Sequence, residues 1–235
     1  MKRLLDVSIT PDATAILVVL SSLLLILVGC KKDDSGTNPP PVVYEDPDTN
    51  KLIQPLNKTS IWSVSRTIYN SNGSVNVTVP VDGVQFTRDS LVAGSTWYFS
   101  FGWYYWFYHG TGGVWWKPAD NTNAAKFRDS ARSLVWKWPA KLNDTYSCVM
   151  YGIPSTARVV SLNHQISIQG RFLNCVGYEY RATSGNTLIT TMYLFPGVGW
   201  LVEEAHIIEF NTSPYYELTS YLSDRWWVTS YFVNP

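Results

Sequence analysis

The feature that most constrains the fold of this chain is a series of short apolar or aromatic runs from about residue 51 to the C-terminus. In Ser74–Val81 valines alternate strictly with other residues, which is the period of a strand with one apolar face. Turn residues such as Ser184-Gly185-Asn186 and Pro196-Gly197 separate successive runs. This spacing predicts a mainly β domain whose antiparallel sheet is strongly curved or forms a half-open β-barrel.

One segment, about residues 123–135, has the period of a helix instead. Asn123 can cap its first turn. Apolar side chains follow at spacings of three and four residues, namely Ala124, Phe127, Ala131, Leu134 and Val135. We therefore expect one short helix packed on the sheet.

Residues 1–29 have the features of a secretory signal peptide. Their basic start is followed by the charge-free run Ala15–Val28, which is shorter than the roughly 20 residues of a membrane-spanning helix. The run leads into Leu27-Val28-Gly29-Cys30, which resembles the lipobox of bacterial lipoproteins. The resemblance implies cleavage before Cys30 and a lipid on this cysteine. The alternative is an ordinary signal peptide, or a short membrane helix, with an incidental cysteine.

Residues 30–50 would then form the lipidated cysteine and a Pro-rich tether, because this stretch has no apolar period. Lys31 and Lys32 follow Cys30, with no Asp at the second mature position. By analogy with the sorting of enterobacterial lipoproteins, this favours the outer membrane. Either orientation, periplasmic or surface-exposed, stays open. Residues 51–235 have the length of a single β-rich domain.

The most unusual segment is Trp97–Tyr108, which has ten aromatic side chains in twelve positions. Every odd position is aromatic, so treated as one strand it would turn that face to the core. The even positions end in Tyr104, Trp106 and Tyr108. These rings carry polar tips and form a candidate surface for a ligand or partner. The alternative is that a second layer covers them.

Two cysteines, Cys148 and Cys175, remain once Cys30 is set aside. Both fall in expected strands, and an exported domain lies in an oxidising compartment. They can form a disulfide if the strands bring their Cα atoms within about 7 Å. Otherwise they remain free thiols.

Composition and motifs argue against several functions. Eighteen basic residues balance eighteen acidic ones, so there is no basic footprint for nucleic acid. Glu204 and His206 alternate onto one strand face, but no third metal ligand is evident. No motif for a catalytic serine, a zinc protease or a phosphate loop occurs. We expect no catalytic residues, no metal and no cofactor, and therefore no enzyme.

The C-terminal half shows an ordered pattern, with a Gly-x-Phe hairpin followed by aromatic-x-Pro-Gly-Val-Gly-x-Val. The matching residues are Gly170, Phe172, Cys175, Tyr193, Pro196, Gly197, Val198, Gly199 and Val202. This pattern resembles a set of Bacteroidetes-type bacterial lipoproteins without an established activity. The resemblance implies a β-rich periplasmic fold. A looser likeness, at the level of the fold alone, is to outer-membrane lipoprotein carriers.

Together these features predict a lipid-anchored, non-catalytic lipoprotein of the cell envelope. It would bind a hydrophobic small molecule in or on its aromatic-rich β domain. The alternative is a structural or interaction module that contacts an envelope protein or a glycan at the outer membrane. The lipid on Cys30 would make the membrane itself a partner.

Overall fold

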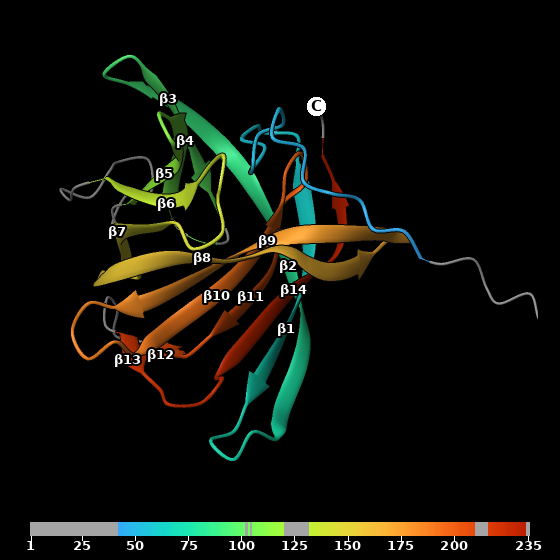
Figure 1. Ribbon diagram of the computed structural model, residues 1–235, viewed down its shortest axis with the longest axis vertical. Helices are drawn as coiled ribbons and strands as arrows, with labels where there is room; N and C mark the ends of the chain where they lie inside the picture. The colour runs from blue at the N-terminus through green and yellow to red at the C-terminus, as the bar shows by residue number, and fades with distance from the viewer. Residues whose placement is uncertain (1–41, 102, 104, 120–131, 210–215, 234–235) are drawn as a thin grey trace, which may run out of the picture. The chain divides into compact units, whose positions relative to one another are not determined.

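The computed structural model describes residues 42–101, 103, 105–119, 132–209 and 216–233 (Figure 1). They belong to a compact unit, Val42–Pro235, which includes the end of the stretch assigned above to the tether. Glu45 pairs with Leu173 in a parallel bridge, so the chain already contacts the sheet at this point. Within the described residues all regular structure is strand, and the mainly β prediction is confirmed.

The described residues form fourteen strands. They are β1 (Ile61–Tyr69), β2 (Val75–Val92), β3 (Ser95–Ser100), β4 (Tyr105–Gly110), β5 (Gly113–Pro118), β6 (Ser133–Lys137), β7 (Thr145–Met150), β8 (Ile153–Ile168), β9 (Arg171–Ala182), β10 (Leu188–Phe195), β11 (Gly199–Ala205), β12 (Ile207–Glu209), β13 (Tyr216–Leu218) and β14 (Asp224–Phe232).

Twelve of these strands form one antiparallel sheet in the order β6-β5-β4-β3-β2-β1-β14-β11-β10-β9-β8-β7. Strands β12 and β13 pair separately. The two outer strands of the large sheet, β6 and β7, lie next to each other, so the sheet is nearly closed into a barrel. Closure of this kind removes the exposed edges that would otherwise pair with other chains.

Side-chain hydroxyls link β6 and β7 across the remaining gap. The Tyr146 hydroxyl donates a hydrogen bond to the Val135 carbonyl at 2.7 Å, and the Val149 amide donates to Ser133 Oγ at 2.7 Å. From β9, the Tyr180 hydroxyl also donates to the Val135 carbonyl, at 2.6 Å. These bonds satisfy backbone groups that a regular strand pair would otherwise occupy.

The short helix expected near residues 123–135 is not seen. Leu134 and Val135 belong instead to β6, in which Leu134 pairs with Trp115 of β5 and Val135 lies at a register shift; residues 120–131 lie outside the described part of the chain. A strand is favoured at Leu134 and Val135 because the neighbouring edge of β5 supplies a ladder of hydrogen bonds. Helical spacing of apolar residues alone could not reveal that partner.

The space between the described strands is filled with aromatic side chains. Those that are at most 1% exposed are Trp62, Phe86, Phe107, Trp136, Tyr178, Tyr180 and Trp200. Trp103 packs edge-on against both Trp136 and Trp200, with ring centroids 6.0 and 5.1 Å apart. The barrel interior is therefore a packed core of buried aromatic and aliphatic side chains.

The segment Lys51–Leu56 covers one end of this core. Ile53 and Leu56 are buried, and the side-chain oxygen of buried Gln54 accepts a hydrogen bond from the Trp200 amide at 2.8 Å. Gly199 has φ +96°, and a Cβ there would lie 2.5 Å from Gln54 Oε1. We call this the closed end of the barrel.

At the opposite end the β1–β2 hairpin extends beyond the neighbouring strands, at the bottom of the view in Figure 1. The turns that join β7 to β8 and β9 to β10 lie at the same end, because consecutive antiparallel strands alternate in direction. We call this the open end.

Candidate functional site

The aromatic run Trp97–Tyr108 is a hairpin rather than one strand. Strand β3 ends at Ser100 and β4 begins at Tyr105, with Tyr98 opposite Phe107 and Phe99 opposite Trp106. Because the chain reverses between these strands, an odd residue of β3 shares its face with an even residue of β4. The predicted division into an odd core face and an even surface is therefore wrong.

Trp106 and Tyr108 belong to a second cluster on the face of β3–β5 that is turned away from the main core. Its members are Trp97, Phe99, Trp106, Tyr108 and Ala119. Trp106 is 2% exposed and Tyr108 is 5% exposed, so neither forms an open binding surface. Tyr104, the third candidate, lies outside the described residues.

A shallow hollow of about 290 Å³ borders this second cluster. Its walls are Ser95, Tyr108, His109, Gly110, Thr111, Trp115 and Arg132. The Arg132 guanidinium lies 5.7 Å from the Tyr108 ring and 5.2 Å from the Trp115 ring, and it donates a hydrogen bond to the Tyr108 hydroxyl at 2.7 Å. The hollow thus has a mainly polar lining with one exposed cation, and of the Tyr108 and Trp115 rings only Trp115 is partly exposed.

His109 contributes little charge to this hollow. Its Nε2 donates a hydrogen bond to the Gln54 carbonyl at 2.7 Å, and burial lowers the pKa of its imidazole. A histidine in this setting serves as a neutral hydrogen-bond donor near pH 7.

A second candidate site lies at the open end, on the inner face of β1 and β2, where an apolar surface surrounds an arginine. Trp62 and Val64 of β1 point into the core, and the pleat of the strand places Arg66 and Ile68 on the same face, where they are only partly buried. On β2, Val81, Val79 and Val77 lie opposite Val64, Arg66 and Ile68 in turn. Their exposure rises toward the hairpin tip, from a partly buried Val81 to 36% at Val79 and 40% at Val77.

We call this surface the rim face, defined by Arg66, Ile68, Val77, Val79, Val81 and Trp226. It is the inner wall of the barrel continued beyond the packed core. Exposed apolar surface that continues a core in this way is a feature of binding sites, because folding alone would bury it.

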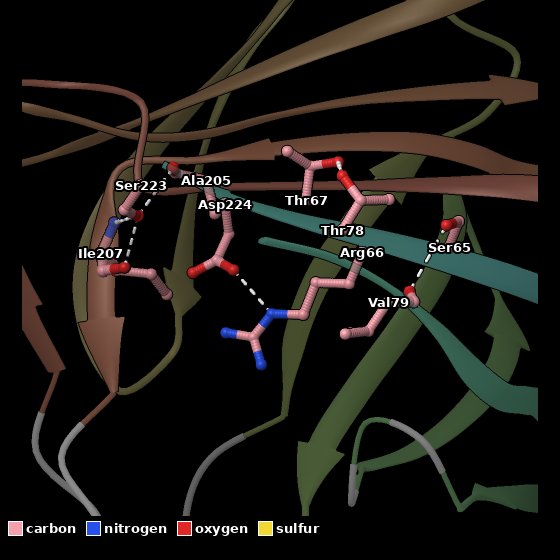
Figure 2. A network of polar contacts seen from close by, with 9 residues as sticks. All are labelled: Ser65, Arg66, Thr67, Thr78, Val79, Ala205, Ile207, Ser223 and Asp224. Atoms are coloured by element: carbon pink, nitrogen blue, oxygen red, sulfur yellow. Dashed lines mark hydrogen bonds and ion pairs between the residues drawn. The ribbon is translucent and has the colours of Figure 1, made fainter. Parts of the chain in front are cut away.

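Arg66 is the cation of the rim face. Its Nε donates to Asp224 Oδ1 at 2.6 Å, and its guanidinium carbon lies 4.7 Å from the centroid of the Trp226 ring. Trp226 is opposite Arg66 in the β1–β14 pairing, and Asp224 is opposite Ile68, so all four side chains share one face. In Figure 2 the contact from Arg66 to the Asp224 carboxylate starts at Nε, and neither terminal nitrogen carries a dashed line.

Asp224 has a fixed position because Ser223 anchors the start of β14. The Ser223 hydroxyl lies 2.9 Å from the Ala205 carbonyl and 2.5 Å from the Ile207 carbonyl, and it accepts a hydrogen bond from the Ile207 amide at 3.0 Å (Figure 2). Ser223 thereby joins the end of β11 and the start of β12 to β14. Asp224, whose carboxylate orients Arg66, directly follows Ser223, so the hydrogen bonds of Ser223 fix its backbone position.

Glu203 is a buried carboxyl group on the same inner face. It is 3% exposed, lies opposite Trp226, and accepts hydrogen bonds from the Tyr151 hydroxyl and from Thr190 Oγ1, the latter at 3.1 Å. Burial raises the pKa of Glu203 to about 7 although both hydrogen bonds lower it; the charge of Asp224 raises it further. A carboxyl with such a pKa is partly protonated at neutral pH.

Sequence reasoning missed Arg66, Asp224 and Glu203. A signal for Arg66 exists, since it continues the alternation of Trp62 and Val64 and so falls on the apolar face of its strand. Glu203 has no such signal, because the neighbouring Glu204 is equally charged and a β-bulge between β10 and β11 decides which residues point inward.

Cys148 and Cys175 are free, buried thiols, so the disulfide alternative is not observed. Cys148 lies opposite Ser155 of β8, and Ser155 lies opposite Ala182 of β9. Cys175 is seven residues along β9 from Ala182, which corresponds to about 23 Å along a strand. Burial raises the pKa of both thiols to about 12, so both are protonated at neutral pH.

Glu204 and His206 do not form part of a metal site in the described region. Glu204 pairs with Arg225, whose Nε lies 3.4 Å from its carboxylate. Within the ranges that the structure describes, no group of three or more His, Cys, Asp or Glu side chains is arranged to hold a metal ion.

The described part of the chain contains no helix with the length and hydrophobicity needed to cross a bilayer. Cys30 lies outside the described residues. No family model matches the chain, and no curated protein or solved structure matches it either.

Proposed function

We propose that the chain is a lipid-anchored, non-catalytic lipoprotein of the cell envelope that binds a hydrophobic ligand on the rim face of its barrel. The anchor would be the lipid on Cys30, and the outer membrane its location, as the lipobox resemblance and the residues after the cysteine suggest. The likeness to Bacteroidetes-type lipoproteins belongs to the same proposal.

The observation that carries this proposal is the apolar wall left exposed at the open end. Val77 and Val79 continue the inner face of the barrel but lie beyond the packed core. The core itself is occupied by large aromatic side chains such as Trp136 and Trp200. A ligand therefore fits on the rim face better than within the barrel.

Photo-crosslinking of the full chain tests this site. A long-chain alcohol that carries a diazirine is irradiated with the protein, and the labelled peptides are identified by mass spectrometry. We expect labelling within residues 75–81. The double variant Val77→Thr/Val79→Thr should lower the yield by about tenfold, because two buried apolar contacts per ligand are lost.

The matched control is Leu91→Thr/Val92→Thr, which changes two exposed apolar residues at the other end of β2. This variant should label like the wild type. Labelling that is spread evenly over exposed apolar residues would contradict a specific site on the rim face.

The second candidate is an interaction module that contacts a glycan or an envelope protein, and the hollow beside Tyr108 and Trp115 favours a glycan. A volume of about 290 Å³ is at the lower end for ligand pockets, so it suits a single sugar ring. The partly exposed Trp115 ring with the adjacent Arg132 suits a sugar that carries an acidic group.

A glycan array probed with the full chain tests this candidate. Trp115→Ala should abolish binding to any glycan that the wild type retains, whereas Phe232→Ala, an exposed aromatic residue on β14, should not. Equal binding by the wild type and Trp115→Ala would eliminate the hollow as the contact site.

A further inference from the structure

The rim face combines an apolar stripe with one half-buried cation. Val79 lies directly opposite Arg66, and Val77 and Val81 flank it on the same face of β2. Side chains two residues apart on a strand are about 6.6 Å apart, so the three valines form a stripe about 13 Å long. This stripe is long enough for a short alkyl chain and passes beside the guanidinium group.

Arg66 is held in one orientation with part of its hydrogen-bonding capacity unused. Asp224 accepts from Nε, and Trp226 covers one face of the guanidinium plane. Among the residues that the structure describes, neither terminal nitrogen of Arg66 makes a hydrogen bond, and Figure 2 draws the dashed line to Asp224 from Nε alone. Two parallel N–H donors on a planar group match the two oxygens of a carboxylate.

The charges around Arg66 permit a second carboxylate. Asp224 faces it from β14 and neutralises one charge, and Glu203 shares the inner face from β11. Glu203 is hydrogen-bonded within the core by Tyr151 and Thr190, and it carries less than a full negative charge below neutral pH. Because the Arg66–Asp224 pair is neutral overall, a ligand carboxylate would be held by the unused N–H donors of the two terminal nitrogens of Arg66 rather than by a net positive charge.

We propose that the rim face binds a single-chain fatty acid. Its carboxylate lies on the two terminal nitrogens of Arg66, and its alkyl chain lies along Val77, Val79 and Val81. This inference rests on the proposed function and adds to it the ligand class and the residue that recognises the head group.

Competition in the crosslinking experiment separates the head group from the chain. The full chain is labelled with a diazirine-bearing dodecanoic acid, and unlabelled dodecanoic acid or dodecanol is added as competitor at equal concentrations. We expect labelling at residues 75–81, with dodecanoic acid competing about tenfold better than dodecanol, since one charge-assisted bidentate contact distinguishes them.

Two variants assign the preference to Arg66. Arg66→Met/Asp224→Asn removes both charges together, so that no buried carboxylate is left without a partner. In this variant, dodecanoic acid and dodecanol should reduce the labelling equally. Arg66→Lys keeps the charge but loses the planar fork, and should retain only part of the preference. Thermal unfolding of each variant confirms that the barrel is intact.

The outcomes are distinct. Labelling at 75–81 with equal competition by acid and alcohol would retain a hydrophobic site but overturn the fatty acid inference. A preference for the acid that survives Arg66→Met/Asp224→Asn would also overturn it. Absence of label from 75–81 with both probes would remove the rim face itself and the proposed function with it.

Discussion

The inner face of the barrel is covered at the closed end and partly exposed at the open end. At the closed end, Gln54 and Ile53 cover the core, and the Trp62 indole donates a hydrogen bond to the Val198 carbonyl at 2.9 Å. At the open end, valines of β2 remain exposed, and the polar groups on this face include Arg66, Asp224 and Glu203. The first end covers its apolar side chains, whereas the second leaves apolar side chains of the inner face exposed, which is why we propose it as the ligand site.

The largest expected difference comes from one tryptophan at each end. Trp62→Ala should lower the free energy of unfolding by about 3–5 kcal/mol, because it leaves a cavity in the packed core and removes the bond to Val198. Trp226→Ala, at the open end, should lower it by about 1 kcal/mol, because Trp226 is only partly buried. Urea unfolding measures both, and equal losses would contradict the comparison.

Glu203 should give the open end a pH dependence opposite in sign to that of His109, whose imidazole pKa is lowered by burial at the closed end. The pKa of Glu203 rises from 4.5 to about 7 on folding, so the folded state holds the proton more tightly than the unfolded state. Stability is therefore highest below about pH 4.5, falls as the pH rises to about 7, and is then constant with respect to this group. The change is on the order of 3 kcal/mol.

Glu203→Gln isolates this contribution. The amide oxygen still accepts hydrogen bonds from Tyr151 and Thr190, but the group no longer titrates. Unfolding free energies measured from pH 4.5 to 7.5 should lose the decline described for the wild type. An unchanged slope in the variant would show that other groups cause it.

The smallest expected change in the free energy of unfolding comes from comparing two valines on β2. Val84→Ala, at a buried position of β2, should lower the free energy of unfolding by about 2 kcal/mol. Val77→Ala should lower it by no more than about 0.5 kcal/mol, because Val77 is 40% exposed. Chemical unfolding measures both, and a large loss at Val77 would mean that it belongs to the stability core rather than to a binding surface.

Local pattern was sufficient for the strand content and for one part of the rim face. The period-two valines of Ser74–Val81 form the β2 half of the β1–β2 hairpin, and the turn residues fall between strands as expected. The same pattern had no means of indicating that the apolar face of these valines would extend beyond the core. Exposure depends on how far the neighbouring strands continue, and those strands are distant in sequence.

The aromatic run and the cysteines show where local pattern failed. A reversal between Ser100 and Tyr105 exchanges the faces of the run, and neither the composition nor the period marks it, since both sides are equally aromatic. The separation of Cys148 from Cys175 depends on the register of β7, β8 and β9. Register is a property of strand pairs, so single-strand patterns do not contain it.

The amino-acid sequence alone was enough to establish a β-rich chain with alternating faces, because side-chain alternation is a local property of the extended backbone. Only the packed barrel decided which of those faces are covered, and it brought Arg66, Glu203 and Asp224 onto one wall from three strands. The proximity of these three side chains depends on strand pairing and on β-bulges. Both are interactions between segments that lie far apart along the chain.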